Sequence, residues 1–167
     1  TEVGAFAGLE TLYNQGNQPC LHISWLFNDA GKPSHTQKWV RAILDEFYGT
    51  EGIHGYGYGQ DEDQGQLGAW FVISSIGLFD VHGLDASDPT FALGSPLFDK
   101  VSIRLSDKYY NGGTFNIRVN GNSKKNIYVQ DYRLNGETLK TPYLPFKTFI
   151  KGGTLEMNMG DTPKDRY

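Results

Sequence analysis

The sequence predicts an α+β fold in which helices come first and an antiparallel β-module follows, with the change near residue 90. Two observations predict this order. Before the change, apolar residues recur with the 3.6-residue period of helices, and after it they alternate with polar residues as in strands. The 167 residues are 38% hydrophobic and 20% charged, a mixture that can bury a core.

The clearest helix is predicted over residues 36–48, where the apolar side chains form a single stripe. Pro33 precedes this stretch. Ser34 and Gln37 have the spacing of a capping box, in which two side chains bond free N–H groups at the start of a helix. Gly49 is a residue suited to end the helix.

Residues 65–79 are apolar on almost every side. We therefore expect a helix that is buried on nearly all sides, which a chain of this length can hardly arrange alone. Residues 20–27 are apolar and aromatic, but the stretch is too short for its period to identify the structure. A short helix is expected over residues 8–13.

The β-module is predicted from stretches of strict alternation between apolar and polar residues. Asn135-Gly136 is a strong signal for a tight hairpin turn within it. Pro142 and Pro145 indicate that residues 143–149 form an edge strand or a loop. The predicted strands lie at 101–106, 115–119, 127–134 and 154–159.

Composition and charge exclude several classes of function. The net charge is −4 and no basic cluster is longer than Lys124-Lys125, so no nucleic acid partner is expected. No run approaches the roughly 18 apolar residues of a membrane-spanning helix, so no membrane partner is expected.

Cys20 is the only cysteine, so an intrachain disulfide cannot form. The chain shows no signal peptide and no initiator methionine, and we expect it to begin inside a longer product.

Asp61, Glu62 and Asp63 form the densest acidic cluster, directly before the helix expected from residue 65. Carboxylates at this place can simply cap the helix, because they interact with its free N–H groups and its dipole. In a loop rich in glycine and tyrosine they also suit a hard cation or a carbohydrate, and a carboxylate pair could act as general base for a water. The residues alone leave both interpretations open.

A second candidate site is the turn at residues 16–19, which is followed by His22. The simpler interpretation is a turn that starts a helix, because Asn and Pro both favour turns. A single histidine is more often a core or surface residue than a ligand. Tyr109 and Tyr110 are likewise interpreted as core residues rather than as a platform for sugars.

Several stretches together carry a resemblance to a known family. In the same order and over nearly its whole length, the chain resembles glycoside hydrolase family 92. Members of this family are calcium-dependent, exo-acting α-mannosidases that invert the anomeric centre. Four of the matching stretches are GNQPCLHISWLFN at 16–28, DEDQGQLGAW at 61–70, GSPLF at 94–98 and GGTLEMNMG at 152–160.

The resemblance implies an architecture in which a β-sandwich is followed by an (α/α)6 barrel with C-terminal strands. Residues 1–90 would supply the C-terminal helices and the base loop of the (α/α)6 catalytic barrel, and residues 91–167 a C-terminal antiparallel β-module. The expected partners are the upstream part of the same enzyme and a mannose-containing glycan. This arrangement would explain the all-apolar segment 65–79, which other barrel helices would wrap. A secreted or periplasmic location is also implied.

The resemblance also implies roles for individual residues. Asp63 would activate the water, with Asp61 as its partner and as a holder of calcium-bound waters. Asn17, Asp61 and Asp63 are the expected Ca2+ ligands. Asn17, Gln18 and His22 are the expected substrate-binding residues. The general acid of the family lies upstream, so this chain alone is expected to be inactive.

Gln18 departs from the family pattern, because many members have glutamate at this position. In the family that glutamate faces the leaving-group side of the cleaved bond. A carboxylate there would repel a phosphodiester, whereas a neutral amide would not. The hypothesis that follows is an enzyme that accepts a mannosyl phosphodiester, such as a mannose-1-phospho-6-mannose cap.

Two other classes of function compete with this interpretation. The first is a non-catalytic carbohydrate-binding β-module, with the C-terminal strands as the sandwich. It predicts sugar binding that is insensitive to chelators. The second is a structural interaction domain whose acidic loop only caps a helix.

Overall fold

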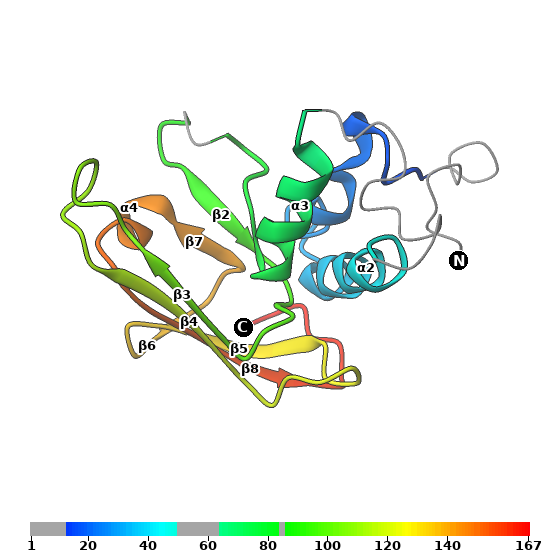
Figure 1. Cartoon of the computed structure of the whole chain (residues 1–167). Coiled ribbons are helices and arrows are strands. Elements are labelled where there is room, and N and C mark those ends of the chain that lie inside the picture. Colours follow the sequence, from blue (N-terminus) through cyan, green and yellow to red (C-terminus); the bar gives the residue numbers. More distant parts are fainter. Residues whose placement is uncertain (1–12, 50–63, 84–85) are drawn as a thin grey trace.

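The computed structural model describes residues 13–49, 64–83 and 86–167. Within these ranges two short 3-10 turns and two longer helices come first, and strands form two sheets (Figure 1). The short helix expected over residues 8–13 lies almost entirely outside the described residues. The 3-10 turns are η1 (Gln18–Cys20) and η2 (Ile23–Trp25), and the helices are α2 (Pro33–Glu46) and α3 (Gln66–Ser75).

The helix predicted over residues 36–48 is confirmed as α2, but the predicted capping box is wrong. Lys32 is the N-cap residue and its side chain makes no capping bond. Ser34 lies inside the helix, where its Oγ donates to Oδ1 of Asp165 at 2.6 Å and its backbone N–H donates to the same oxygen at 3.2 Å. The carboxylate of Asp165 thus caps α2 from 131 residues away. The C-cap residue is Phe47 rather than Gly49.

The apolar segment 65–79 is only partly helical, and it is not buried on all sides. Helix α3 ends at Ser75, and the next residues form the short strand β1 (Leu78–Phe79). The helix buries Leu67 and Trp70, whereas Val72 is 61% exposed. The expectation of burial on nearly all sides therefore fails within this chain.

The strands form a three-stranded and a five-stranded sheet. The smaller sheet has the order β1-β2-β7 and is antiparallel. The larger sheet has the order β3-β4-β8-β5-β6. The remaining elements are β2 (Thr90–Leu93), β3 (Lys100–Arg104), β4 (Thr114–Asn120), β5 (Tyr128–Leu134), β6 (Glu137–Leu139), β7 (Tyr143–Pro145), the one-turn helix α4 (Phe146–Phe149) and β8 (Gly153–Gly160).

The four predicted strands are confirmed, but the module is not purely antiparallel. Strand β8 pairs parallel with β4 and antiparallel with β5, so it lies between two strands that are both distant from it in sequence. The predicted turn at Asn135-Gly136 joins β5 to β6, and both residues have the positive φ angles of a tight hairpin turn. Strand β7 lies at the edge of the smaller sheet, as its prolines predict.

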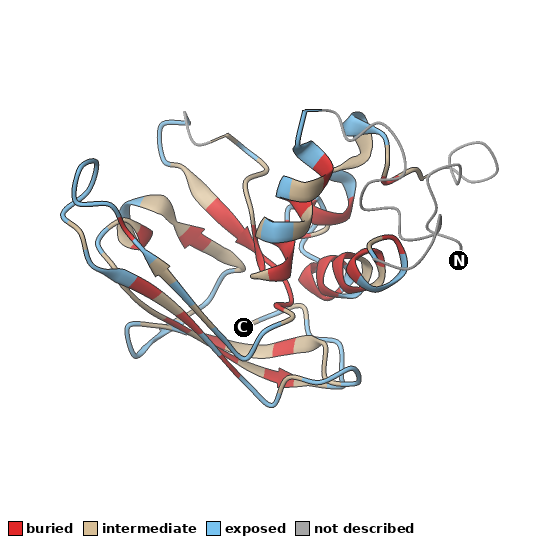
Figure 2. Cartoon of the chain, in the orientation of Figure 1, coloured by how far each residue is buried: buried red, intermediate tan, exposed pale blue. Residues whose placement is uncertain are grey.

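Two apolar clusters hold the fold together. The first lies between the two sheets, and the second lies between α2, η2 and α3 (Figure 2). Strand β1 comes from the segment before residue 90, and it pairs with β2 and contributes Leu78 to the first cluster. The second cluster consists of Trp25, Val40, Ile43, Leu44, Phe47, Trp70 and Ala92.

Polar side chains of α2 connect the helix to both sheet regions. The buried amide of Gln37 donates to Tyr167 Oη at 2.8 Å and to Tyr132 Oη at 3.3 Å, and it accepts from the N–H of Val129 at 3.0 Å. The buried Arg41 guanidinium donates to the backbone and hydroxyl oxygens of Ser95, both at 3.0 Å. It also donates to the carbonyl of Pro96 and the side chain of Asn122. Burial lowers the pKa of Arg41, and Asp45 opposes this shift.

Candidate functional site

The two aspartates expected at the catalytic centre, Asp61 and Asp63, lie outside the described residues. The structure does describe the helix that follows them. The N-cap residue of α3 is Gly65, which has a positive φ angle and offers no side chain. None of the acids at 61–63 therefore occupies the N-cap position, where a capping carboxylate would be expected.

The expected substrate-binding residues Asn17, Gln18 and His22 lie together on the turn around η1. Asn17 is the N-cap of this turn, and its carbonyl accepts the N–H of Cys20 at 2.8 Å. All three side chains are exposed, and none forms a hydrogen bond with another described residue. Their amide and imidazole groups are thus available to a ligand.

Trp70 of α3 holds this turn in place. Its indole N–H donates to the carbonyl of Leu21 at 2.7 Å, and the side chain is buried. The ring of Tyr48, just after α2, stacks on Trp70 with centroids 5.6 Å apart and planes 9° apart. Because Trp70 lies on α3, the turn that carries Asn17 is tied to the helix that follows the acidic cluster in sequence (Figure 1).

Hydrogen bonds between side chains connect the residues just before this turn to the end of α2. The amide of Gln15, which is fully buried, donates to Tyr48 Oη at 3.3 Å and accepts from Tyr13 Oη. Burial raises the pKa of Tyr13, and the thiol of Cys20 raises it further. Tyr13 therefore remains a neutral hydrogen-bond donor throughout the physiological pH range. These contacts join the segment before the turn to Tyr48, which follows α2.

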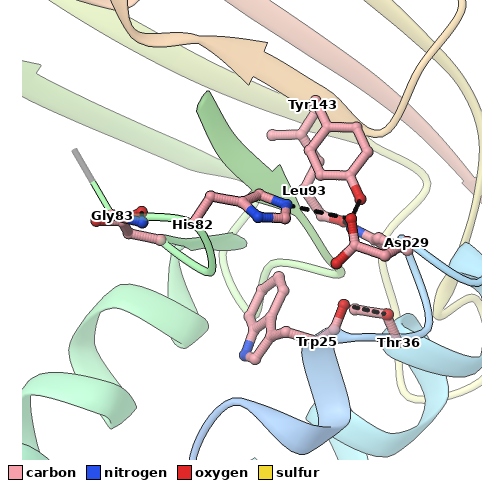
Figure 3. A network of polar contacts seen from close by, with 9 residues as sticks. Trp25, Asp29, Thr36, His82, Gly83, Leu93 and Tyr143 are labelled. Atoms are coloured by element: carbon pink, nitrogen blue, oxygen red, sulfur yellow. Dashed lines mark hydrogen bonds and ion pairs between the residues drawn. The ribbon is translucent and has the colours of Figure 1, made fainter. Parts of the chain in front are cut away.

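A second polar cluster, centred on Asp29, was not predicted from the sequence (Figure 3). Oδ1 of Asp29 accepts from Tyr143 Oη at 2.5 Å and lies 3.1 Å from Nε2 of His82. Burial raises the pKa of Tyr143, and the hydrogen bond to Asp29 adds to this. The three residues are far apart in sequence, and no spacing rule connects them. The cluster links the loop before α2 to β7 and to the chain after β1.

Nearby contacts indicate that this cluster fastens segments together. Trp25 of η2 stacks on Phe79 of β1, with ring centroids 5.2 Å apart, and Asn28 donates to the carbonyl of Leu93 in β2 at 3.1 Å. The Asp29 cluster therefore continues a line of contacts between the helical segment and the smaller sheet.

The described residues contain no group of three or more His, Cys, Asp or Glu side chains that could hold a metal ion. Among the same residues, no helix is long and apolar enough to cross a membrane. Two of the three expected calcium ligands, Asp61 and Asp63, fall outside this search. The third, Asn17, offers an exposed amide oxygen, which is a type of ligand that calcium accepts.

Solved structures give the class of protein to which this fold belongs. The chain superposes on a family 92 α-mannosidase from Bacteroides thetaiotaomicron with a TM-score of 0.80 and 30% sequence identity, over 92% of this chain and 19% of that one. A structure of the same enzyme in complex with mannoimidazole matches equally well. An inverting mannosidase of the family from that organism matches with a TM-score of 0.75 and 33% identity, over 90% of this chain and 19% of that one. The class is that of glycoside hydrolases.

Sequence comparisons give the family. The glycosyl hydrolase family 92 catalytic domain matches residues 2–161. A secreted glycosidase of Arthroderma benhamiae is 30% identical over 149 residues, which cover 87% of this chain and 18% of the relative. The chain therefore belongs to glycoside hydrolase family 92, and it spans about a fifth of the length of these relatives.

Proposed function

We propose that this chain is the C-terminal part of an inverting, calcium-dependent exo-α-mannosidase that hydrolyses terminal α-mannosides of glycans. The observation that carries the proposal is family membership over residues 2–161, together with the superposition on α-mannosidases. In this proposal residues 1–90 contribute helices to an (α/α)6 barrel and residues 91–167 form the C-terminal β-module. The enzyme acts outside the cytoplasm, in keeping with the secreted fungal relative.

Asp63 acts as the general base in the proposed mechanism. Its carboxylate takes a proton from a water that attacks the anomeric carbon from the face opposite the leaving group, which inverts the configuration. Asp61 lies two residues away in sequence and orients that water. The general acid comes from the upstream part of the enzyme, so this chain alone releases no mannose.

The exposed turn around η1 contributes the sugar-facing groups. Asn17 and His22 are available for hydrogen bonds to hydroxyls because neither is engaged by another described residue. Asn17 would join Asp61 and Asp63 in holding calcium, directly or through water. Bound calcium would hold the mannose O2 and O3 hydroxyls and favour a flattened ring. The tie from Trp70 to Leu21 keeps this turn beside α3.

Mannose release by the longer enzyme tests the activity. Release is expected from α-mannosides with calcium, and it should stop with excess chelator. Asp63→Asn should lower kcat by about a thousandfold, because general-base catalysis typically contributes 10²–10⁴-fold. Glu62→Gln is the matched control in the same acidic cluster and should keep most of the activity. Release that persists in chelator, or equal losses in both variants, would contradict the proposed roles.

The leaving-group side is assigned to Gln18, which is exposed on η1. We propose that its neutral amide admits a mannosyl phosphodiester as the substrate. Gln18→Glu should shift the preference towards mannobiose and away from mannose-1-phospho-6-mannose by about tenfold, the equivalent of about 1.4 kcal/mol. The ratio of kcat/KM values for the two substrates measures the shift. An unchanged ratio would sink the phosphodiester hypothesis while leaving the mannosidase proposal intact.

A further inference from the structure

The connection between β3 and β4 presents aromatic side chains to solvent. Tyr109 is 72% exposed and Tyr110 is 37% exposed, so the expectation that they belong to the core is wrong. The ammonium of Lys108 lies 5.1 Å from the centroid of the Tyr109 ring, which is the geometry of a cation–π contact. Solvent-exposed tyrosines of this kind are typical of binding surfaces rather than of cores.

A pocket of about 640 Å³ lies in the same connection, which is within the size range of small-molecule sites. Its wall combines a cationic, an anionic and two hydroxyl side chains. The lining residues are Arg104, Leu105, Ser106, Asp107, Gly112, Gly113 and Thr114. They flank the two tyrosines in sequence.

Backbone hydrogen bonds fold the connection around this pocket. The carbonyl of Ser106 accepts the N–H of Tyr110 at 2.9 Å and of Tyr109 at 3.4 Å, which draws both tyrosines back towards a lining residue. The N–H of Leu105 donates to the carbonyl of Gly113 at 3.0 Å and closes the base of the loop. The pocket and the tyrosines therefore belong to one locally ordered structure.

The chemistry of the lining points to a neutral, hydroxyl-rich ligand. The charges of Arg104 and Asp107 cancel, so the pocket attracts neither anions nor cations strongly. The guanidinium only donates, the carboxylate only accepts, and the hydroxyls of Ser106 and Thr114 do both. Neighbouring hydroxyls of a sugar need this combination, and the apolar face of a sugar ring packs on an aromatic ring.

We propose that the β3–β4 connection is a carbohydrate-binding site that holds a sugar unit of an extended neutral mannan. Figure 1 shows this connection on the opposite side of the molecule from α2, at the edge of the five-stranded sheet. Asp107 is the only carboxylate among the lining residues, and the described residues contain no group of three or more His, Cys, Asp or Glu side chains that could hold a metal ion, so binding here is expected to need no calcium. It goes beyond the proposed hydrolysis, and only the choice of mannan as ligand rests on that function.

Migration of the 167-residue chain in native gels that contain yeast mannan and excess chelator tests the site. Chelator removes calcium-dependent recognition, and the Tyr109 variants distinguish this surface from calcium-independent binding at the η1 turn. The wild-type chain should be retarded. Tyr109→Ala should bind about tenfold more weakly, the size of one lost stacking contact. Tyr109→Phe should retain binding because it retains the ring.

Phe98→Ala is the matched control, because Phe98 is a 49% exposed aromatic residue that precedes β3 and does not belong to the β3–β4 connection. It should leave the retardation unchanged. Circular dichroism of each variant establishes that the fold is kept. A folded wild-type chain that mannan does not retard, or a Tyr109→Ala chain that binds like wild type, would overturn the proposal. Either result would leave the hydrolysis assay of the longer enzyme unaffected.

Discussion

Helices α2 and α3 are both rich in apolar side chains, yet they meet the rest of the chain in different ways. Helix α2 has one apolar stripe, which packs in a cluster with Trp25, Trp70 and Ala92. Its buried polar residues, Gln37 and Arg41, find partners in both sheet regions. Helix α3 buries Trp70 but leaves Val72 61% exposed.

The two helices thus differ in how far this chain covers their apolar side chains. The contacts of α2 named above come from described residues, including a capping carboxylate from Asp165. Helix α3 has an apolar residue on its open face, where a helix of a self-contained domain would carry polar ones. This is consistent with the proposed place of α3 among further barrel helices.

The largest effect is expected from breaking the polar contacts of α2. Arg41→Leu should lower the free energy of unfolding by about 3 kcal/mol, because it leaves the buried oxygens of Ser95 and Pro96 and the half-buried oxygen of Asn122 without their donor. Urea denaturation measures this loss. Lys38→Leu removes a positive charge from an exposed position of the same helix and should change little. Equal losses in both variants would show that charge, rather than the buried contacts, matters.

A smaller effect is expected at the N-terminus of α2, and it depends on pH. Burial raises the pKa of Asp165, but bonds from Ser34 and Lys32 outweigh this and hold it below its usual value of 3.8. A lowered pKa stabilises the fold above the unfolded value, and the stabilisation is lost as the pH falls through the folded value. Asp165→Asn should therefore cost about 1 kcal/mol at pH 7.

The cost of Asp165→Asn should shrink as the pH falls below 3.8, because the wild-type carboxyl also becomes neutral. Thermal denaturation of both proteins across this range measures the difference. Asp107→Asn changes an aspartate in the β3–β4 connection and is a suitable control. A cost of Asp165→Asn that stays constant with pH would refute the capping role.

The smallest effect is expected on the open face of α3. Val72→Ser should change the unfolding free energy of this chain by less than about 0.5 kcal/mol, because the side chain already faces solvent. In the longer enzyme the same substitution should cost about 1.5 kcal/mol if other helices cover Val72. Urea denaturation of both proteins gives the comparison. An equally small loss of unfolding free energy in the chain and in the longer enzyme would argue against other helices packing over Val72.

Local patterns in the sequence predict much of this fold. The apolar stripe of α2, the alternation of the strands and the turn at Asn135-Gly136 are all properties of neighbouring residues, and the structure confirms them. Contacts between distant residues were missed. The predicted capping box is wrong because the Ser34 hydroxyl donates to Asp165 instead of capping the helix. The parallel pairing of β4 with β8 has no signal in neighbouring residues.

In the candidate site, too, the sequence predicts what neighbouring residues determine and misses contacts between distant residues. The turn with Asn17, Gln18 and His22 is exposed as a ligand site requires, and its sequence marked it as a turn. The roles of Asp61 and Asp63 remain predictions from the resemblance. The cluster of Asp29, His82 and Tyr143 was missed because its members come from three separate segments. Tyr109 was assigned to the core by residue type, although it follows the predicted strand 101–106, and the structure leaves it exposed.

The central position of β8 has a consequence for the synthesis of the protein. The β3–β4 and β5–β6 hairpins each form from residues that are close in sequence, but within the sheet they join only through β8. Until residues 153–160 have left the ribosome, β4 and β5 each keep one edge without a partner. Unpaired strand edges can associate with other chains. A nascent chain that stalls before β8 therefore exposes two such edges at once, and chaperones should bind it at that stage.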